Sequence, residues 1–138
     1  MLNVEDSLLE LVEGDYYATI ATVLPDGSPH QTVVHIDYDG EHLLIPTADG
    51  RRKVKNVRRN PNVSVNVVDP DEPHLYISVS GEVVDVTTEG AEELATELGR
   101  HYGELAADES FMDGYSGPER VLLRIRPTGH ISYLPDEQ

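Results

Sequence analysis

The sequence predicts a mostly β protein, a closed antiparallel barrel with helices at its edges, formed by a single domain over residues 1–138. Short β-branched stretches alternate between apolar and polar residues, and turn signals separate them. A helical pattern interrupts the strands only after the third of them. The regular alternation of strands and helices that a doubly wound parallel sheet requires is therefore missing.

The first part of the chain predicts one helix and three strands. Residues 3–13 place apolar side chains at roughly helical spacing, and Gly14 is the expected stop. Strands are expected at residues 17–24, 30–38 and 42–46. The turn signals between them are Pro25-Asp26-Gly27-Ser28 and Asp39-Gly40, and the latter is typical of a β-hairpin.

The middle of the chain predicts a short helix followed by two strands. The basic residues 51–59 form about two helical turns that Asn60-Pro61 ends. A strand is expected at residues 62–68 and a loop at residues 69–73. A longer strand at residues 75–86 contains Gly81, where a bulge is expected.

The last part of the chain predicts another helix and a strand pair. Thr87 or Thr88 is expected to cap a helix with an apolar stripe of Ala91, Leu94, Ala95 and Leu98. Residues 107–118 are acidic and predict a loop. Strands at residues 120–126 and 130–134 are expected on either side of a Pro127-Thr128-Gly129 turn.

The composition excludes several classes of site. The chain has no cysteine, which removes disulfides, thiolate zinc sites and cysteine nucleophiles. The six histidines form no metal-binding motif, so no metal is expected, and His30 and His35 are predicted to face opposite sides of their strand. The N-terminal residues do not resemble a signal peptide, and no apolar run is long enough to span a bilayer. We therefore expect a cytoplasmic protein that does not act at a membrane.

The charge balance is strongly acidic, with a formal net charge of −16. Lys53 and Lys55 are the chain's two lysines. This pattern is typical of proteins from a salt-adapted, halophilic cytoplasm, where the Debye length falls to about 3 Å in molar salt. General binding to nucleic acid is not expected from such a chain.

Positive charge is concentrated in one segment. Of the ten Lys and Arg residues, six lie in the run Arg51-Arg-Lys-Val-Lys-Asn-Val-Arg-Arg59, which contains no acid. Because these charges repel one another, the run predicts an anion site, with a solvated helix face as the alternative.

The residues before this run predict how an anion would be held. A strand ends near Thr47, Gly50 allows a tight turn, and a helix then begins with free amides. Helix N-termini bind phosphate through these amides, and Arg51 or Arg52 together with Lys53 would add charged hydrogen bonds. Val54 and Val57 are expected to face the body of the protein.

These segments together resemble the pyridoxamine-phosphate-oxidase-like flavin split-barrel family, most closely its branch that uses the deazaflavin coenzyme F420. The resemblance extends from about Tyr16 to Leu134. It rests on Ala21-Thr-Val-Leu-Pro-Asp-Gly-Ser-Pro29, on Arg51-Arg-Lys-Val-Lys-Asn-Val-Arg-Arg-Asn-Pro61, on Ser80-Gly-Glu, and on Arg120-Val-Leu-Leu with His130. In the family, a pattern matched here by Arg51, Lys53, Asn56, Val57, Asn60 and Pro61 follows the third strand and binds the cofactor phosphate.

The resemblance implies a homodimer of six-stranded antiparallel split β-barrels with flanking helices, in which two cofactors lie at the subunit interface. It implies three groups of cofactor-binding residues: Gln31, Thr32 and Val33 beside the ring system; Thr47, Arg51, Arg52, Lys53 and Asn56 around the phosphate; and Tyr76 and Ser78 near the ring or substrate. Tyr76 and Ser78 share one face of their strand, where packing across the barrel is the alternative role.

Two departures favour the deazaflavin branch over pyridoxamine phosphate oxidases. The strand segment Gln31-Thr32-Val33-Val34 lacks the arginine that flavin-binding relatives use for phosphate. The dimerising and substrate-binding segment that follows the barrel in those oxidases is also absent after Leu134.

The expected function is that of an F420-dependent oxidoreductase that transfers hydride to an unsaturated small organic substrate. Because the cofactor carries the chemistry, no catalytic residue is assigned, and the proton donor stays open between a tyrosine, a histidine and water. The alternatives are an FMN-dependent oxidoreductase on the same barrel, a barrel that binds flavin or haem without turnover, and a polyanion-binding module built on the basic helix.

Overall fold

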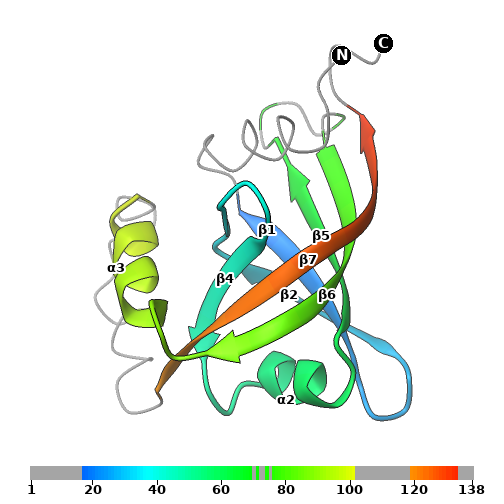
Figure 1. Cartoon of the computed structure of the whole chain (residues 1–138). Coiled ribbons are helices and arrows are strands. Elements are labelled where there is room, and N and C mark those ends of the chain that lie inside the picture. Colours follow the sequence, from blue (N-terminus) through cyan, green and yellow to red (C-terminus); the bar gives the residue numbers. More distant parts are fainter. Residues whose placement is uncertain (1–16, 70, 72–73, 75, 102–118, 134–138) are drawn as a thin grey trace.

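The computed structural model describes residues 17–69, 71, 74, 76–101 and 119–133. Within them, one seven-stranded antiparallel sheet carries two helices (Figure 1). The strands are β1 (Ala18–Val23), β2 (Pro29–Val34), β3 (Asp37–Tyr38), β4 (Leu43–Ala48), β5 (Asn62–Val68), β6 (Tyr76–Thr87) and β7 (Arg120–Tyr133). Their order in the sheet is β2-β1-β5-β6-β7-β4-β3.

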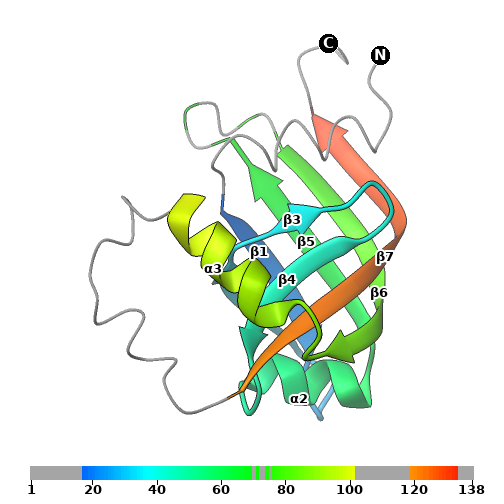
Figure 2. The same ribbon diagram turned by 60° about the vertical axis from the view of Figure 1, so that its left-hand side comes forward.

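A single chain segment borders both edges of this sheet. β2 and β3 stand at opposite ends of the strand order, yet only His35 and Ile36 separate them along the chain. β2 also contacts β4, so the sheet curls into a barrel (Figure 2). The predicted strand at residues 30–38 is thus two strands with a bend after Val34. If β2 and β3 are counted as one interrupted strand, the sheet has six strands, the number predicted for the split barrel. The predicted split-barrel fold is confirmed.

The barrel is filled by aliphatic side chains from alternate strand positions. The largest fully buried ones include Ile20, Ile36, Leu43, Ile45, Val65, Val67, Ile77, Leu123 and Ile125. Because neighbouring residues of a strand point to opposite faces, the residues between these core positions face outward. This alternation decides which predicted site residues share a face.

Two helices pack against the outside of the barrel. α2 (Arg52–Arg59) contacts β1 and β6 at the lower end in Figure 1, and α3 (Ala91–His101) packs against β4 and β7 (Figure 2). In α3, the predicted stripe is confirmed, since Ala91, Ala95 and Leu98 are buried and Leu94 is half-buried.

The predicted cap of α3 is wrong. β6 continues through Thr87, and the helix begins only at Ala91 after Gly90, which has a φ of 78°. The Thr87 hydroxyl instead accepts a hydrogen bond from the Glu89 amide at 3.1 Å, within the turn that precedes the helix.

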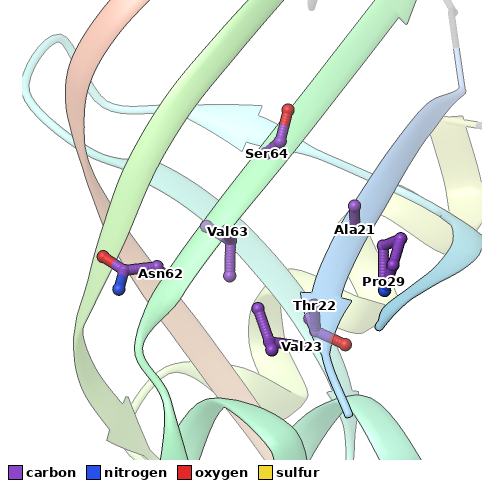
Figure 3. Close-up of a pocket in the computed structure, with 7 residues that line it drawn as sticks. All are labelled: Ala21, Thr22, Val23, Pro29, Asn62, Val63 and Ser64. Carbon is purple, nitrogen blue, oxygen red and sulfur yellow. The ribbon is translucent and has the colours of Figure 1, made fainter. Parts of the chain in front are cut away.

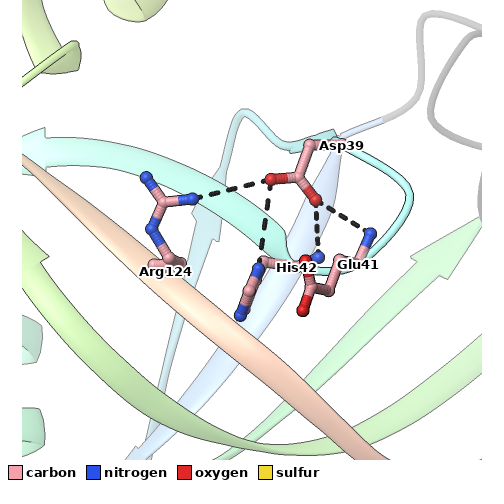
Figure 4. Close-up of polar contacts among 4 residues, drawn as sticks. All are labelled: Asp39, Glu41, His42 and Arg124. Atoms are coloured by element: carbon pink, nitrogen blue, oxygen red, sulfur yellow. Dashed lines mark hydrogen bonds and ion pairs between the residues drawn. The ribbon is translucent and has the colours of Figure 1, made fainter.

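Both predicted hairpin turns are confirmed. At the first, the Leu24 amide donates to the Ser28 carbonyl at 2.8 Å, and Gly27 has a φ of 89°. At the second, the Asp39 carboxylate accepts hydrogen bonds from the backbone amides of Glu41 and His42. It also forms an ion pair of 3.5 Å with Arg124 of β7 (Figure 4). Asp39 therefore ties the β3–β4 hairpin to β7.

The predicted turn at Pro127-Thr128-Gly129 is also wrong, because β7 runs unbroken from Arg120 to Tyr133. The register shifts there, since Ser80 pairs with Gly129 while Gly81 pairs with Pro127. A bulge accommodates proline in a sheet, because the missing amide is not needed for pairing. Gly81 is required at this point: a Cβ on it would lie 2.6 Å from Cγ2 of Ile125. The expected bulge at Gly81 is thus confirmed.

Two other predictions, the helix at residues 3–13 and the loop at residues 107–118, lie outside the described residues. Within the described part of the chain, neither helix has the length and apolar character needed to cross a membrane.

Candidate functional site

The basic segment forms helix α2 as predicted. The helix starts at Arg52 after Gly50, whose φ of 90° makes the turn, and ends at Arg59 before Asn60. No side chain caps its first turn by a hydrogen bond, and its first turn contains no acidic residue. Such an N-terminus presents amide donors and the positive end of the helix dipole, which favours an anion.

The cations of α2 have different roles. Arg58 pairs with Asp49 at 2.9 Å, at an exposed position. Arg59 donates to the Val23 carbonyl at 2.6 Å, joining the helix to β1. Arg52 and Lys55 are exposed to solvent. Arg58 and Arg59 are therefore engaged in contacts within the protein, whereas Arg52 and Lys55 are accessible to an anion from solvent.

Lys53 differs from the other cations because it is buried, with 9% of its surface exposed. Its Nζ atom is nevertheless not among the fully buried side-chain atoms that lack a hydrogen-bond partner in the described residues. Burial lowers the pKa of Lys53, and repulsion from Arg51 lowers it further. Partial desolvation disfavours the charged form of the lysine, and a bound anion would favour it.

Asn56 lies one helical turn after Lys53 and joins α2 to the barrel. It is fully buried, and its side-chain amide donates to the Thr22 hydroxyl of β1 at 3.0 Å. Its side-chain oxygen accepts from Arg59 at 3.3 Å. Within this chain, Asn56 thus holds the helix that carries Lys53, and its predicted contact with a cofactor stays a prediction.

Thr47 is also buried, with 5% of its surface exposed, near the end of β4. The next strand residue is Ala48, whose carbonyl accepts from the Arg51 amide at 3.3 Å. The structure therefore gathers Thr47, Arg51, Arg52 and Lys53 around the passage from β4 into α2.

The predicted residues of β2 do not share one face. Gln31 and Val33 are exposed, and 67% of the Val33 surface is accessible. Thr32 faces the other way, together with His30. Nδ1 of His30 and Oγ1 of Thr32 are buried, and neither atom has a hydrogen-bond partner among the described residues.

Gln31 and Val33 belong to an outer face that reaches across the sheet to β6. Val33 pairs with Thr19, Thr19 with Asn66, and Asn66 with Ser78, so these four side chains form one row. A parallel row consists of Gln31, Ala21, Ser64 and Ser80. Tyr76 lies beyond the first row, opposite Val68. The sequence prediction that Tyr76 and Ser78 share a face is confirmed.

We call this surface the uncharged outer face. Its residues are Thr19, Ala21, Val23, Pro29, Gln31, Val33, Asn62, Ser64, Asn66, Val68, Tyr76, Ser78 and Ser80, none of which is charged; it is bounded by the charged Glu82, which lies on the same side of β6 and pairs with Asn62. At one end it is hollowed by a pocket of about 250 Å³ lined by Ala21, Thr22, Val23, Pro29, Asn62, Val63 and Ser64 (Figure 3).

The candidate residues thus fall into two sets that meet at the edge strand β2. One set surrounds α2 and the inner side of β2, and the other lies on the uncharged outer face. His30, which the sequence analysis did not count among the candidate site residues, has a buried ring nitrogen. Its shared parity with Thr32 was visible, but only the structure shows that both side chains lack partners. No group of three or more His, Asp or Glu side chains suited to a metal occurs in the described part of the chain.

Residues 4–131 match the protein-family model for pyridoxamine 5'-phosphate oxidase. The chain belongs to this family. The family includes oxidoreductases, and the match confirms the family that the basic segment and the strand pattern predicted.

Solved structures give the same fold. A protein named F420 reductase is 30% identical, with a TM-score of 0.72, over 95% of this chain and 98% of that one. A conserved hypothetical protein from Mycobacterium tuberculosis is 26% identical, with a TM-score of 0.68, over 96% and 86% of the two chains. HutZ, a heme storage protein from Vibrio cholerae, is 20% identical, with a TM-score of 0.65, over 95% of each chain. At that identity, HutZ supports the fold alone.

Proposed function

We propose that this protein is an oxidoreductase that uses coenzyme F420 to transfer hydride to an unsaturated small organic substrate. Lys53 is the observation that carries the proposal: its side chain is mostly buried in the first turn of α2, and burial together with Arg51 lowers its pKa. The F420 reductase that is 30% identical to this chain favours a deazaflavin over FMN.

The residues around α2 fit a cofactor that bears a phosphate group. Lys53 and Arg51 or Arg52 would hold the phosphate, with the α2 amides and the Thr47 hydroxyl beside them. The bound deazaflavin supplies the redox chemistry, the transfer of a hydride to the acceptor. The protein's part is to fix the position of the ring and to exclude water from it, which needs no acid or base at a fixed position.

We also propose that the protein is a homodimer whose copies meet on the uncharged outer face. The pocket on this face, about 250 Å³, is smaller than the roughly 300–1,000 Å³ typical of small-molecule sites. A second copy would deepen it and cover Val33, which is 67% exposed. It would also bring Gln31, Tyr76 and Ser78 into a shared interface, where the resemblance places cofactor and substrate.

A fluorescence titration with F420 and FMN in parallel, in concentrated KCl, tests the cofactor. Tight binding of F420 together with weak binding of FMN is the expected result, followed by screening of unsaturated acceptors with reduced F420. Preferential binding of FMN would overturn the deazaflavin assignment, and binding of neither, or of haem alone, would overturn the proposed enzyme.

A further inference from the structure

Exposed apolar side chains gather at one end of the uncharged outer face. Within the described part of the chain, four large apolar side chains are exposed: Tyr17, Val33, Val68 and Val84. Val33 and Val68 belong to this face, and Tyr17 immediately precedes β1 with the same strand parity as the outward-facing Thr19. Three of the four exposed side chains therefore lie together, and a contiguous exposed apolar patch marks a binding surface.

Aromatic rings surround this patch. The ring of Tyr17 packs against that of His35, with the centroids 5.3 Å apart and the planes tilted by 41°. On the other side of Tyr17, the pairing of β1 with β5 places Val68, which pairs in turn with Tyr76 of β6. We call Tyr17, His35, Val68 and Tyr76 the aromatic end of the face. Burial lowers the pKa of His35, so its ring is neutral at pH 7 and the aromatic end carries no charge.

The aromatic end lies far from the basic helix along the same strand. α2 attaches to the other end of β1, where the Arg59 guanidinium donates to the Val23 carbonyl (Figure 1). Tyr17 precedes Val23 by six residues of extended chain, which corresponds to about 20 Å. The proposed phosphate site and the aromatic end are therefore at opposite ends of one wall, and an extended cofactor fits between them.

The aromatic end has no lysine or arginine, and the charged residues next to it in sequence are acids. All ten Lys and Arg residues of the chain lie within residues 51–59, at residue 100 or within residues 120–126. Asp37 follows His35 by two positions, and Asp69 follows Val68 directly. A negatively charged ligand would be repelled by these acids and would find no cation to offset the repulsion.

We propose that the aromatic end binds the hydride acceptor, and that this acceptor is a planar, conjugated compound without negative charge. The inference rests on the proposed function and names the substrate class of that site. The rings of Tyr17 and Tyr76 provide flat apolar surfaces on which a conjugated acceptor stacks. Asp37 and Asp69 select against acceptors that carry a carboxylate or a phosphate.

A second copy of the chain is the alternative occupant of the aromatic end. In the proposed homodimer it covers Val33, which lies next to Tyr17 on the outer face. The net charge of the chain is −16, so a second copy would bring further acids toward Asp37 and Asp69. An uncharged acceptor brings none, and the aromatic end therefore fits the acceptor better than it fits the partner.

Steady-state kinetics with reduced F420 and two matched acceptors test the charge preference. The acceptors are benzalacetone, a planar enone, and 4-carboxybenzalacetone, which adds one carboxylate. In both, a hydride from reduced F420 and a proton from solvent saturate the carbon–carbon double bond, and F420 is left oxidised. We expect kcat/KM to be about tenfold higher for benzalacetone, and Asp69→Asn to narrow the ratio. Equal kcat/KM values for the two acceptors would overturn the proposal.

Tyr17→Leu and Tyr17→Phe form a matched pair that tests the stacking contact. Tyr17→Leu removes the ring and should raise the KM of benzalacetone about fivefold while kcat stays within about twofold. Tyr17→Phe keeps the ring and should leave KM within about twofold of the wild type. Neither variant should change the Kd of F420, or the mass of the particle measured by light scattering. An unchanged KM in folded Tyr17→Leu, or dissociation of the dimer as its main effect, would contradict the inference.

Binding of benzalacetone measured by NMR separates this inference from the proposed function. In protein with ¹³C-labelled tyrosine rings, benzalacetone should cause a saturable shift of the Tyr17 resonances, which are assigned with Tyr17→Phe. Such a shift without any F420-dependent reduction would support the acceptor site and reject the F420 enzyme. F420-dependent reduction that is indifferent to Tyr17→Leu would support the enzyme and reject the site. Tyr17 resonances that do not move, with or without F420, would overturn the inference.

Discussion

The residue that determines the behaviour of the candidate site is Lys53. Its side chain is mostly buried, and burial lowers its pKa, so partial desolvation of the charge should weaken the ligand-free protein, and a bound anion should offset that cost. A group of this kind lowers the stability of the ligand-free protein and raises its affinity for an anion. The sequence predicted an anion site that includes Lys53, but not that Lys53 was the buried cation of the segment.

Replacing Lys53 by methionine should therefore act in opposite directions on binding and on stability. Lys53→Met should weaken F420 binding by roughly 1.5–3 kcal/mol, the cost of one charged hydrogen bond. The midpoint of thermal unfolding of the ligand-free variant should rise, because an apolar side chain of similar length replaces a buried charge. Fluorescence titration and thermal melts measure the two effects.

Lys55→Met is the matched control, because Lys55 is exposed on the same helix. It should change neither quantity by more than about 0.5 kcal/mol. A Lys53→Met variant that binds F420 within a factor of two of the wild type would show that the phosphate lies elsewhere.

The lowered pKa of Lys53, caused first by burial and then by Arg51, predicts a pH dependence for anion binding. The anion favours the protonated ammonium, so affinity should be full below the lowered pKa and should decline as pH rises through it. Sulfate is a suitable probe, because its charge stays constant between about pH 7 and about pH 10, the range in which a lysine with a lowered pKa titrates. Calorimetry should show this decline of sulfate affinity in the wild type. A similar decline in Lys53→Met would show that a group other than Lys53 causes it.

The ligand-free protein should show the opposite trend. The unfolded chain holds the Lys53 proton more tightly than the folded chain, so stability should rise as pH increases from the lowered pKa toward the ordinary value of about 10.4. Comparing the urea midpoints of wild type and Lys53→Met across this range isolates the contribution of Lys53.

At the scale of elements, the attachment of α2 to β1 decides how firmly the site is built. The Asn56 amide is buried and donates to Thr22, which is itself 1% exposed. Thr22→Val should leave that amide without an acceptor and reduce the free energy of unfolding by about 1–3 kcal/mol. It should also weaken phosphate binding, since α2 is then held less firmly. Urea unfolding measures the first effect and calorimetry the second.

Thr19→Val provides the comparison, because Thr19 is on the same strand but faces outward. We expect the free energy of unfolding of Thr19→Val to differ from that of the wild type by no more than about 0.5 kcal/mol. Equal stabilities for Thr22→Val and Thr19→Val would mean that the Asn56 amide has another acceptor.

Elements with strong local signals were predictable from the sequence. The turns at Gly27 and Asp39-Gly40 and the end of α2 at Asn60-Pro61 depend on neighbouring residues, and all three are confirmed. The segment Pro127-Thr128-Gly129 has an equally strong turn signal, but it pairs with β6 and forms a bulge within β7 instead of a turn. The partnerless state of His30 and Thr32 could not be predicted either, because it depends on strands far apart in the sequence.

At the scale of the whole molecule, the absence of charge from one face of an acidic protein is the main feature. The net charge is −16, yet the two rows from Val33 to Ser78 and from Gln31 to Ser80 across β2, β1, β5 and β6 carry none of it, and the next charged side chain on this side is Glu82, opposite Asn62. A second copy of a chain with this charge could approach closely only where like charges do not meet. This argument supports the proposed homodimer, and the dimer should form through the uncharged outer face.

An aspartate on that face should therefore separate the copies. Val33→Asp should convert a particle of twice 15.3 kDa into one of 15.3 kDa, measured by light scattering after gel filtration. Val84→Asp is the control, since Val84 is 45% exposed but lies outside this face. If Val33→Asp remains dimeric, or if Val84→Asp is the variant that dissociates, the copies meet through another surface.

The single segment that borders both edges of the sheet also has a consequence for biosynthesis. β3 and β4 reach the remainder of the sheet through the pairing of β4 with β7, the last described strand. While the chain is still being made, β1, β2, β5 and β6 can pair, and α2 has already emerged from the ribosome. The part of the barrel formed by β3 and β4 lacks this strand pairing until residues 120–133 have been made. We therefore expect the protein to acquire its cofactor only after translation of the barrel is complete.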